Sequence, residues 1–301
     1  MPAEAGGPHF IGIGSSRCGT TFLHAALRRH PEIWLPPVKE LHFFDRGGRR
    51  RRRARGRGTG SVLKATRRML RGDRDGPADV RFLLRHRFGA HDLAAYRAWF
   101  RLGAGRVCGE ITPGYCILED ERIALIRREL PDLRLIFLMR DPIDRAWSAA
   151  YKSLVRDRGR SFDAVAPEEW RRKIESRGLA RRSDYPGILD RWERHFPAEQ
   201  IRVGFFEDLQ AAPEAFLREI HLFLGVAPRT DGSWSTSRGR NASGSSACPP
   251  ELEALLAAQF LDMNRRLHER FGSHATAWYH RAQRVLDRDS RSRSAAAPDP
   301  C

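Results

Sequence analysis

The segment Phe10–Thr21 (FIGIGSSRCGTT) constrains the fold more than any other part of this 301-residue chain. An apolar, β-branched run ends in a glycine-rich turn with two threonines, and an amphipathic stretch follows. This order predicts a strand that leads through a phosphate-binding loop into a helix. Gly14 and Gly19 have the spacing of a nucleotide-binding P-loop, but Thr20 stands where such a loop has lysine, and the nearest cation is Arg17. The loop indicates a nucleotide phosphate and argues against an ATPase; the plainer alternative is a turn without a ligand.

Apolar runs and helical patterns alternate along most of the chain. The run Arg134–Met139 (RLIFLM) is continuously apolar after its first residue, which is typical of a parallel strand covered on both faces. Strands that alternate with helices form parallel βαβ units. The expected fold is therefore α/β: a P-loop-like open parallel sheet flanked by helices on both faces. We expect strands over 9–13, 107–109, 134–139 and 201–206, and helices over 20–29, 91–100, 119–130, 143–154, 187–196, 213–224 and 251–271.

A hydrophobic content of 41% is sufficient for one large domain, which we place at residues 1–286. The arginine-rich segment 46–60 (RGGRRRRRARGRGTG) has no apolar period and is expected to be a flexible insertion in this domain. A basic helix is expected over 61–72 and a loop rich in serine and glycine over 230–249. The last residues, 287–301, are expected to form a disordered tail.

The formal net charge of +17 is an arginine excess, because only four of the 54 basic residues are lysines. A basic chain can bind nucleic acid or an anionic substrate. The alternative is a GC-biased coding sequence that places arginine wherever a cation is tolerated. The arginines are scattered, which favours this alternative for most of them. The run at 46–60 also lacks the interleaved aromatic residues of single-strand binders, so a nucleic-acid partner is disfavoured.

The chain has no apolar run of transmembrane length, and its first residues lack the features of a signal peptide. The five cysteines are odd in number and have no metal-ligand spacing. We therefore expect reduced thiols, no membrane span and a cytoplasmic, bacterial-type setting.

Four polar groups of residues follow predicted strands, at the end where open α/β sheets bind ligands. They are Gly14–Thr21, Glu110–Tyr115, Arg140–Ser148 and Glu207–Asp208. In the third group Arg140 ends its strand, and Ser148 lies one or two turns into the next helix. Arginine can bind a phosphate dianion through two hydrogen bonds, and the serine hydroxyl adds another donor. The plainer alternative is a helix start at Asp141 with a surface ion pair.

Together these motifs resemble the PAPS-dependent sulfotransferases, whose donor is 3′-phosphoadenosine 5′-phosphosulfate. More narrowly, they are similar to bacterial relatives of the heparan-sulfate-type carbohydrate sulfotransferases. The resemblance covers about residues 9–280. Its motifs are SSRCGTT at 15–21, PPVKELHFFD at 36–45, GEITPGY at 109–115, RDPIDRAWSAAY at 140–151, LDRWERHFPAEQIRVGFFEDL at 189–209 and RGR at 238–240. Arg17 and Arg238 depart from the family pattern, which has lysine at both places.

The resemblance implies a sulfotransferase fold and a role for each motif. Arg140 and Ser148 would hold the 3′-phosphate, and Gly239 with Arg240 would close over the nucleotide. Arg17 and Arg238 would stabilise the charge that develops during transfer, as cations placed at a reacting group do. The remaining donor-binding residues that it implies are Ser16, Cys18, Gly19, Thr20 and Thr21. No metal is expected, because arginines and backbone N–H groups would neutralise the donor.

The resemblance makes Glu40, in KELHFFD, the base that removes the acceptor proton. His42 is the alternative, because two residues along an extended segment both side chains project to the same side. A base can be either residue type if its pKa lies near the working pH. Glu110 is expected to be an orienting or structural residue near the site. Glu207 and Asp208 are expected to cap the helix that begins at Pro213.

The sequence thus favours an enzyme that moves a sulfuryl group from PAPS to a hydroxyl, or as second choice an amine, of a carbohydrate or small molecule. A P-loop kinase or ATPase is the first alternative, and the missing lysine and acidic metal ligand argue against it. A non-enzymatic binder of anionic polymers is the second. The acceptor and the oligomeric state are not encoded in any motif that we identify.

Overall fold

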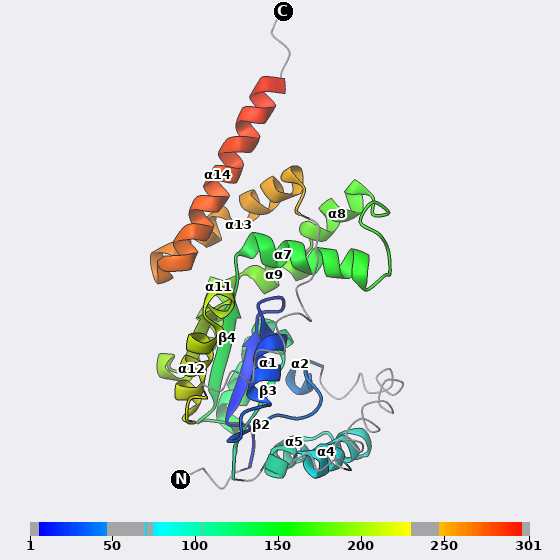
Figure 1. Cartoon of the computed structure of the whole chain (residues 1–301), viewed down its shortest axis with the longest axis vertical. Coiled ribbons are helices and arrows are strands. Elements are labelled where there is room, and N and C mark those ends of the chain that lie inside the picture. Colours follow the sequence, from blue (N-terminus) through cyan, green and yellow to red (C-terminus); the bar gives the residue numbers. More distant parts are fainter. Residues whose placement is uncertain (1–5, 47–69, 71–74, 104, 230–246, 297–301) are drawn as a thin grey trace, which may run out of the picture.

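The computed structural model describes residues 6–46, 70, 75–103, 105–229 and 247–296 (Figure 1). Five parallel strands form one sheet in the order β2-β3-β1-β4-β5. They are β1 (Phe10–Gly14), β2 (Ile33–Trp34), β3 (Val107–Ile111), β4 (Arg134–Met139) and β5 (Ile201–Phe205). The central strand β1 lies between β3 and β4, where the direction of strand addition reverses. Ligands of open α/β sheets bind outside the carboxyl ends of the strands at such a point.

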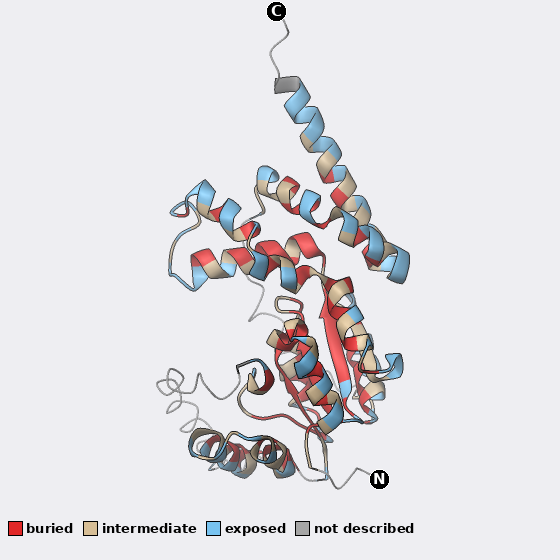
Figure 2. Ribbon diagram, turned by 180° about the vertical axis from the view of Figure 1, so that it is seen from behind, coloured by how far each residue is buried: buried red, intermediate tan, exposed pale blue. Residues whose placement is uncertain are grey.

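Helices cover both faces of the sheet, and the alternation of side chains along β4 divides them. Leu135, Phe137 and Met139 point into one core with α5, α6 and α10, whereas Ile136 and Leu138 point into the other with α1 and α12. Figure 2 shows the strands buried between these layers. The predicted α/β fold with an open, doubly covered parallel sheet is therefore confirmed.

The helices of the described residues follow the predicted order, with several additions. They are α1 (Thr20–Leu27), α2 (Phe43–Arg46), α4 (Gly76–Phe88), α5 (Leu93–Phe100), α6 (Asp120–Glu129), α7 (Pro142–Tyr151), α8 (Pro167–Ile174), α9 (Arg177–Ser183), α10 (Tyr185–Glu193), α11 (Phe206–Ala211), α12 (Pro213–Leu224), α13 (Pro250–Phe271) and α14 (Ser273–Ala296). A π-helical turn, Lys152–Arg156, extends α7. A third core joins α7, α8, α13 and α14 beyond the carboxyl edge of the sheet.

The prediction of disorder from residue 287 is wrong for 287–296, because α14 continues to Ala296. Local pairs support these turns: Arg293 pairs with Asp289, and the Ser292 and Ser294 hydroxyls bond to carbonyls four residues earlier. The arginine-rich insertion from residue 47 onward, the expected helix at 61–72 apart from Leu70, and most of the loop at 230–249 lie outside the described residues.

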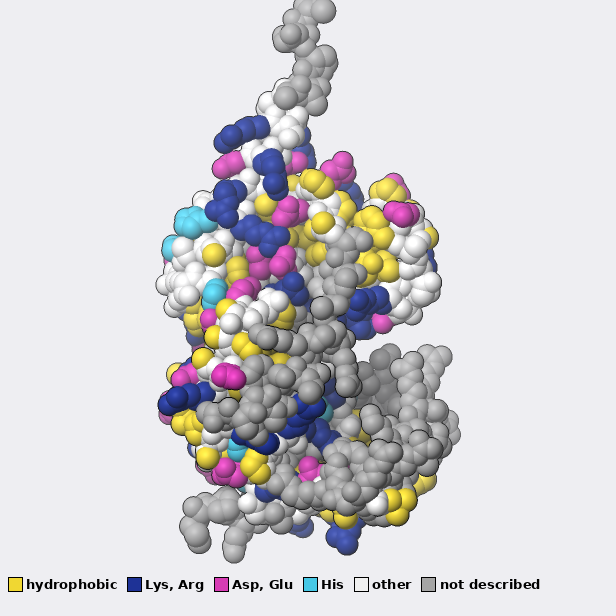
Figure 3. Space-filling model, viewed as in Figure 1, with side chains coloured by type: hydrophobic (Ala, Val, Ile, Leu, Met, Phe, Trp, Pro, Cys, Tyr) yellow, Lys and Arg dark blue, Asp and Glu magenta, His cyan; other side chains and the backbone are white. Residues whose placement is uncertain are grey.

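Figure 1 shows α14 projecting away from the body of the molecule. Arginines and carboxylates both line this helix, as the surface in Figure 3 shows. Among the described residues, no helix is both long enough and apolar enough to span a membrane.

Candidate active site

The loop after β1 wraps around the start of α1 at the switch point of the sheet. Gly19 precedes the helix with a φ of 85°, and no side chain caps the helix start. A Cβ at Gly19 would lie 2.4 Å from Leu209 Cδ2, so only glycine fits there. The first N–H groups of α1 lack intrahelical acceptors and carry the positive end of the helix dipole, which suits an anion.

The loop is hydrogen-bonded to α7, on which the second cationic motif lies. Arg17 Nε donates to Ser148 Oγ at 2.9 Å, and Ser148 is buried. Arg17 has a φ of 75°, a strained value for a residue with a side chain. Arg140, at the end of β4, lies over the Phe206 ring at 4.8 Å and pairs weakly with Asp144 at 3.4 Å.

A buried tyrosine ties the ends of the two motifs together. The Tyr185 hydroxyl donates to the Arg140 carbonyl at 2.9 Å and lies 3.6 Å from Cys18 Sγ. Burial raises the pKa of the Cys18 thiol to about 11, so this cysteine stays protonated and packs beneath the loop. Its side chain supports the loop from the core, and contact of Cys18 with the donor stays a prediction.

Other cations lie close to Arg17. Burial, and then the charges of Arg156 and Arg140, lower the pKa of Arg17. Below it, Arg145 is fully buried and bonds to Ser183 Oγ and the Leu179 carbonyl, both neutral acceptors. Cations that crowd together at one site repel one another, and an anion bound among them relieves that repulsion.

The segment that carries Glu40 lies beside the loop. The Glu40 N–H donates to the Ile111 carbonyl at 3.1 Å, which aligns the segment with the end of β3. Glu40 and His42 have φ values of 65° and 54°. Left-handed backbone is costly for such residues and concentrates at functional sites. Three such strained residues, counting Arg17, therefore lie around one edge of the sheet.

Glu40, His42 and Asp45 form a chain of polar contacts. His42 Nε2 lies 3.5 Å from Glu40 Oε2, and His42 Nδ1 lies 2.7 Å from Asp45 Oδ2. The contact with His42, assisted by Lys39, lowers the pKa of Glu40 to about 2 although burial opposes the shift. Glu40 is also the more exposed of the two candidate bases, at 42% of its side chain against 16% for His42. The geometry favours Glu40 as the proton acceptor, with His42 and Asp45 behind it.

Glu110 supports this segment from below. Its buried carboxylate accepts from Tyr96 and Thr112 hydroxyls at 2.6 Å each and from Tyr115 at 3.3 Å. Burial raises the pKa of Glu110 to about 6 in spite of these donors. The Tyr115 hydroxyl also accepts from the Phe43 N–H at 2.8 Å. Glu110 therefore orients the start of α2 through Tyr115, as expected of a supporting residue.

Lys39 is a site residue that sequence reasoning missed. Its ammonium lies 3.2 Å from Thr21 Oγ1, 3.4 Å from Thr20 Oγ1 and 3.0 Å from Glu40 Oε1. It therefore joins the loop to the candidate base. The available signal was its residue type: the chain uses arginine for 50 of its 54 basic positions, yet has lysine here. Asp45 was also missed, although it lies three residues after His42.

Helix α14 braces the turn that follows Arg140. The Arg281 guanidinium contacts Asp141 Oδ2 at 2.7 Å, Asp144 Oδ1 at 2.9 Å and Glu253 Oε1 at 2.8 Å. Glu207 Oε1 accepts from the Asp141 N–H at 3.1 Å and from Trp278 Nε1 at 3.0 Å. Glu207 therefore braces the Arg140 turn, and the prediction that it caps the helix from Pro213 is wrong.

The structure brings together most of the predicted site residues. The loop from Ser16 to Thr21, the Glu40 segment and the pair Arg140 and Ser148 all lie at the carboxyl edge of the sheet. The predicted site residues outside the described part of the chain are Arg238, Gly239 and Arg240, and their role stays a prediction. Among the described residues, no group of three or more His, Cys, Asp or Glu side chains is arranged to hold a metal ion.

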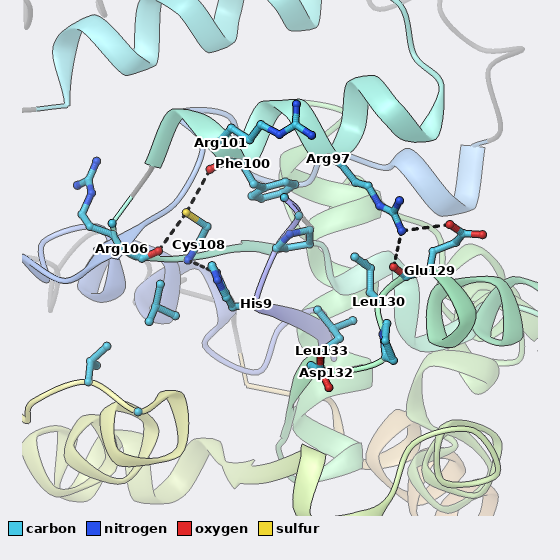
Figure 4. Close-up of a pocket in the computed structure, with 18 of the residues that line it drawn as sticks. His9, Arg97, Phe100, Arg101, Arg106, Cys108, Glu129, Leu130, Asp132 and Leu133 are labelled. Atoms are coloured by element: carbon cyan, nitrogen blue, oxygen red, sulfur yellow. Dashed lines mark hydrogen bonds and ion pairs between the residues drawn. The ribbon is translucent and has the colours of Figure 1, made fainter. Parts of the chain in front are cut away.

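A cavity of about 640 Å³ lies at the opposite end of the sheet, where β1, β3 and β4 begin (Figure 4). His9 Nδ1 accepts from the Cys108 N–H, and Arg97 pairs with Glu129, so these polar groups serve the fold. Burial raises the pKa of Cys108 to about 12, which makes its thiol unreactive. This cavity shares no residue with the loop or with Glu40.

Fold and site define an α/β protein with an uncapped helix start, loop hydroxyls and a lysine beside an ionised carboxylate, an arrangement suited to an anionic ligand. A family model described as the sulfotransferase family matches residues 8–231. The chain therefore belongs to the sulfotransferase family, as the sequence motifs predicted.

Solved structures agree with this assignment. A sulfotransferase from Alicyclobacillus acidocaldarius is similar with a TM-score of 0.61 and 26% identity, over 90% of this chain and 98% of that chain. The sulfotransferase domain from the curacin biosynthetic pathway, at 18% identity, shares the fold with a TM-score of 0.53, over 75% of this chain and 76% of that chain.

Two curated human proteins are also similar. Heparan sulfate glucosamine 3-O-sulfotransferase 6 is 26% identical over 222 residues, which is 73% of this chain, and carbohydrate sulfotransferase 15 is 49% identical over 39 residues, or 13% of this chain. The chain spans about half the length of the first (52%) and 7% of the second.

Proposed function

We propose that this chain transfers a sulfuryl group from PAPS to a hydroxyl, or as second choice an amine, of a carbohydrate or small-molecule acceptor. The observation that carries the proposal is the bond from Arg17 to Ser148, which joins the loop after β1 to α7, at whose start Arg140 lies. Two anion-binding motifs side by side fit a donor with phosphate groups at both its 5′ and 3′ ends. A carbohydrate acceptor is supported by the names of the two curated human relatives.

The residues present fit this donor. The uncapped start of α1, the Thr20 and Thr21 hydroxyls and Lys39 are donors suited to the 5′-phosphosulfate. Arg140 and Ser148 are suited to the 3′-phosphate, and Phe206 holds the Arg140 guanidinium from one side. Among these groups the cations outnumber the anions, as an anionic donor requires.

The proposed reaction is an in-line displacement. The acceptor oxygen forms a bond to sulfur while the bond from sulfur to the bridging oxygen breaks. That electron pair stays on the 5′-phosphate of adenosine 3′,5′-bisphosphate, and the acceptor proton passes to Glu40. Glu40 is ionised at neutral pH, as a glutamate with its usual pKa of 4.5 also is, and its side chain is partly exposed, so it can accept this proton. The contact with His42 stabilises the ionised carboxylate. Charge that builds on the leaving oxygen is stabilised by the N–H groups at the start of α1.

A reducing, cytoplasmic bacterial setting is part of the proposal. Three thiols, those of Cys18, Cys108 and Cys116, are free and buried in the described structure, as suits proteins of reducing compartments.

Calorimetry with adenosine 3′,5′-bisphosphate tests the donor site. We expect wild-type binding in the micromolar range, and Arg140→Ala to weaken it by about tenfold or more, since an arginine hydrogen bond to an anion contributes on the order of 1.5–3 kcal/mol. Lys173→Gln on α8 is the control for the loss of one positive charge. A wild-type chain that does not bind the bisphosphate contradicts the proposal.

Transfer of labelled sulfate from PAPS to a panel of oligosaccharides and phenols tests the reaction. Glu40→Gln should lower the rate by about 10²- to 10⁴-fold, the usual contribution of a general base, and leave bisphosphate affinity within about twofold. An active Glu40→Gln variant together with an inactive His42→Asn variant would assign the base to His42. Equal activity in all three proteins would remove both residues from the mechanism.

A further inference from the structure

Lys39 contacts both the donor loop and the proton acceptor. Its ammonium is within 3.4 Å of two loop hydroxyls, Thr20 and Thr21, and 3.0 Å from Glu40 Oε1. Its side chain is 20% exposed, so it is neither free in solvent nor buried in the core. A lysine in this position can reach any group that lies between the loop and Glu40.

The cation within the loop, Arg17, makes contact with α7. Arg17 Nε bonds to Ser148 on α7, and the charges that shift its pKa most belong to Arg156 and Arg140. These contacts place Arg17 with the groups proposed for the 3′-phosphate. Lys39, in contrast, contacts both the loop threonines and the Glu40 carboxylate.

We infer that Lys39 is a catalytic residue that binds the sulfuryl group between donor and acceptor. The inference rests on the proposed function above. Glu40 and Lys39 neutralise each other before the reaction. When Glu40 takes the acceptor proton it becomes neutral, and Lys39 loses its partner anion. The lysine charge then becomes available to the sulfuryl oxygens and the leaving oxygen in the step in which negative charge builds there.

The residue type agrees with this role. An ammonium is a compact charge with three rotatable donors on a flexible stem, so it can keep one contact while it exchanges another. A guanidinium is a planar fork whose hydrogen bonds have fixed directions. In a chain with 50 arginines among its 54 basic residues, lysine at the junction of loop and base matches this requirement.

A comparison of two nucleotides shows whether Lys39 contacts the sulfuryl group itself or attracts anions in general. Calorimetry is done with PAPS and with adenosine 3′,5′-bisphosphate, which differ by the sulfuryl group alone. In Lys39→Gln we expect the Kd of PAPS to rise about tenfold and that of the bisphosphate to stay within about twofold. Lys39→Arg should recover most of the PAPS affinity, and the control Lys173→Gln should bind both nucleotides as the wild type does.

The rate and its pH dependence provide a second readout. With any acceptor that the wild type sulfates, Lys39→Gln should lower the turnover rate by about 10²-fold. Its acid limb should also move to higher pH, because Lys39 helps to lower the pKa of Glu40. A residue that only holds the Glu40 segment in place would alter neither the ratio of the two affinities nor the acid limb.

The outcomes distinguish this inference from the proposed function. A wild-type chain that binds neither nucleotide overturns both. A wild type that binds both, together with a Lys39→Gln variant whose two affinities match the wild type, overturns the role of Lys39 alone. Equal weakening of both nucleotides in Lys39→Gln also overturns it, because Lys39 would then serve the 5′-phosphate and not the sulfuryl group.

Discussion

Arg17 Nε and Ser148 Oγ lie 2.9 Å apart, although 131 positions separate the two residues in the chain. The bond crosses from the loop after β1 to the helix after β4, and these two strands are neighbours in the sheet. One serine therefore sets the orientation of the loop arginine relative to Arg140. This contact couples the two proposed phosphate sites, alongside the link through Tyr185, which bonds to the Arg140 carbonyl and lies 3.6 Å from Cys18 Sγ.

Ser148→Ala removes that coupling. We expect the affinity for adenosine 3′,5′-bisphosphate to fall about tenfold, because a buried hydrogen bond to a charged group contributes on the order of 1.5–3 kcal/mol. Calorimetry measures the change, and Ser290→Ala on the exposed part of α14 is the matched control. If Ser148→Ala binds the bisphosphate as tightly as the wild type, the Ser148 hydroxyl does not contact the ligand, and its bond to Arg17 does not contribute to ligand binding.

His42→Asn should move the acid limb of the transfer rate to higher pH. The His42 contact is the largest cause that holds the pKa of Glu40 near 2, below its usual value of 4.5. Without this contact the pKa of Glu40 rises, so Glu40 becomes protonated at a higher pH than in the wild type. A protonated Glu40 cannot accept the acceptor proton. Rates from pH 3 to 8 measure the limb. His195→Asn, which affects a surface pair with Asp120, should leave it in place.

Tyr115→Phe should destabilise the protein by about 1–2 kcal/mol, because Glu110 loses a donor and the Phe43 N–H loses its acceptor. The pKa of Glu110 is about 6, above its usual value of 4.5, so the folded state binds the proton more tightly. The contribution of this group to unfolding free energy therefore falls from pH 4.5 to 6 and is constant above. The variant raises this pKa further, so its loss of stability should be larger at pH 8 than at pH 5.

Urea unfolding at the two pH values measures this difference, with Tyr279→Phe on α14 as the control. An equal loss at both pH values would show that the Tyr115 hydroxyl does not interact with the Glu110 carboxylate.

Gly114→Ala tests how tightly the polar chain behind Glu40 is packed. A Cβ at this position would lie 2.8 Å from Asp45 Oδ2 and 3.3 Å from His42 Cε1, so both side chains would have to move. We expect the transfer rate to fall about tenfold, since small displacements of catalytic groups cost this much or more, with bisphosphate affinity unchanged. Gly178→Ala is the control, because the nearest atom to its Cβ is Arg182 Nη1 at 3.9 Å. A fully active Gly114→Ala variant would show that the rate is insensitive to His42 and Asp45.

The sheet was predictable because its strands carry local signals. β4 is a continuous apolar run after Arg134, β3 and β5 are mainly apolar with one charged residue each, and the loop after β1 has a recognisable glycine spacing. The two-residue strand β2 was missed because pairing with β3 defines it, and pairing is a property of the tertiary structure. Helix α14 was not predicted: the last predicted helix ended at residue 271, and 287–301 was expected to be a disordered tail. The polar last turns of α14 are supported by ion pairs that composition alone does not reveal.

The site was predictable one motif at a time, and its contacts between motifs were not. Arg17 and Ser148 were both identified, yet their bond depends on the order of β1 and β4 in the sheet. Lys39 was missed because its partners Thr20 and Thr21 lie on another element. Glu207 was misassigned because its partner Trp278 lies 71 residues further on.

Arg281 pairs with Asp141 and Asp144, so residues of α14 support the turn that follows Arg140. The family match stops at residue 231, fifty positions before Arg281. A chain trimmed at that boundary would keep the loop, Glu40 and Arg140. It would leave the buried Asp141 carboxylate without its guanidinium, at the residue next to Arg140. The family match therefore ends before a residue that supports the turn after β4, and a chain trimmed at residue 231 would hold the proposed 3′-phosphate site less firmly.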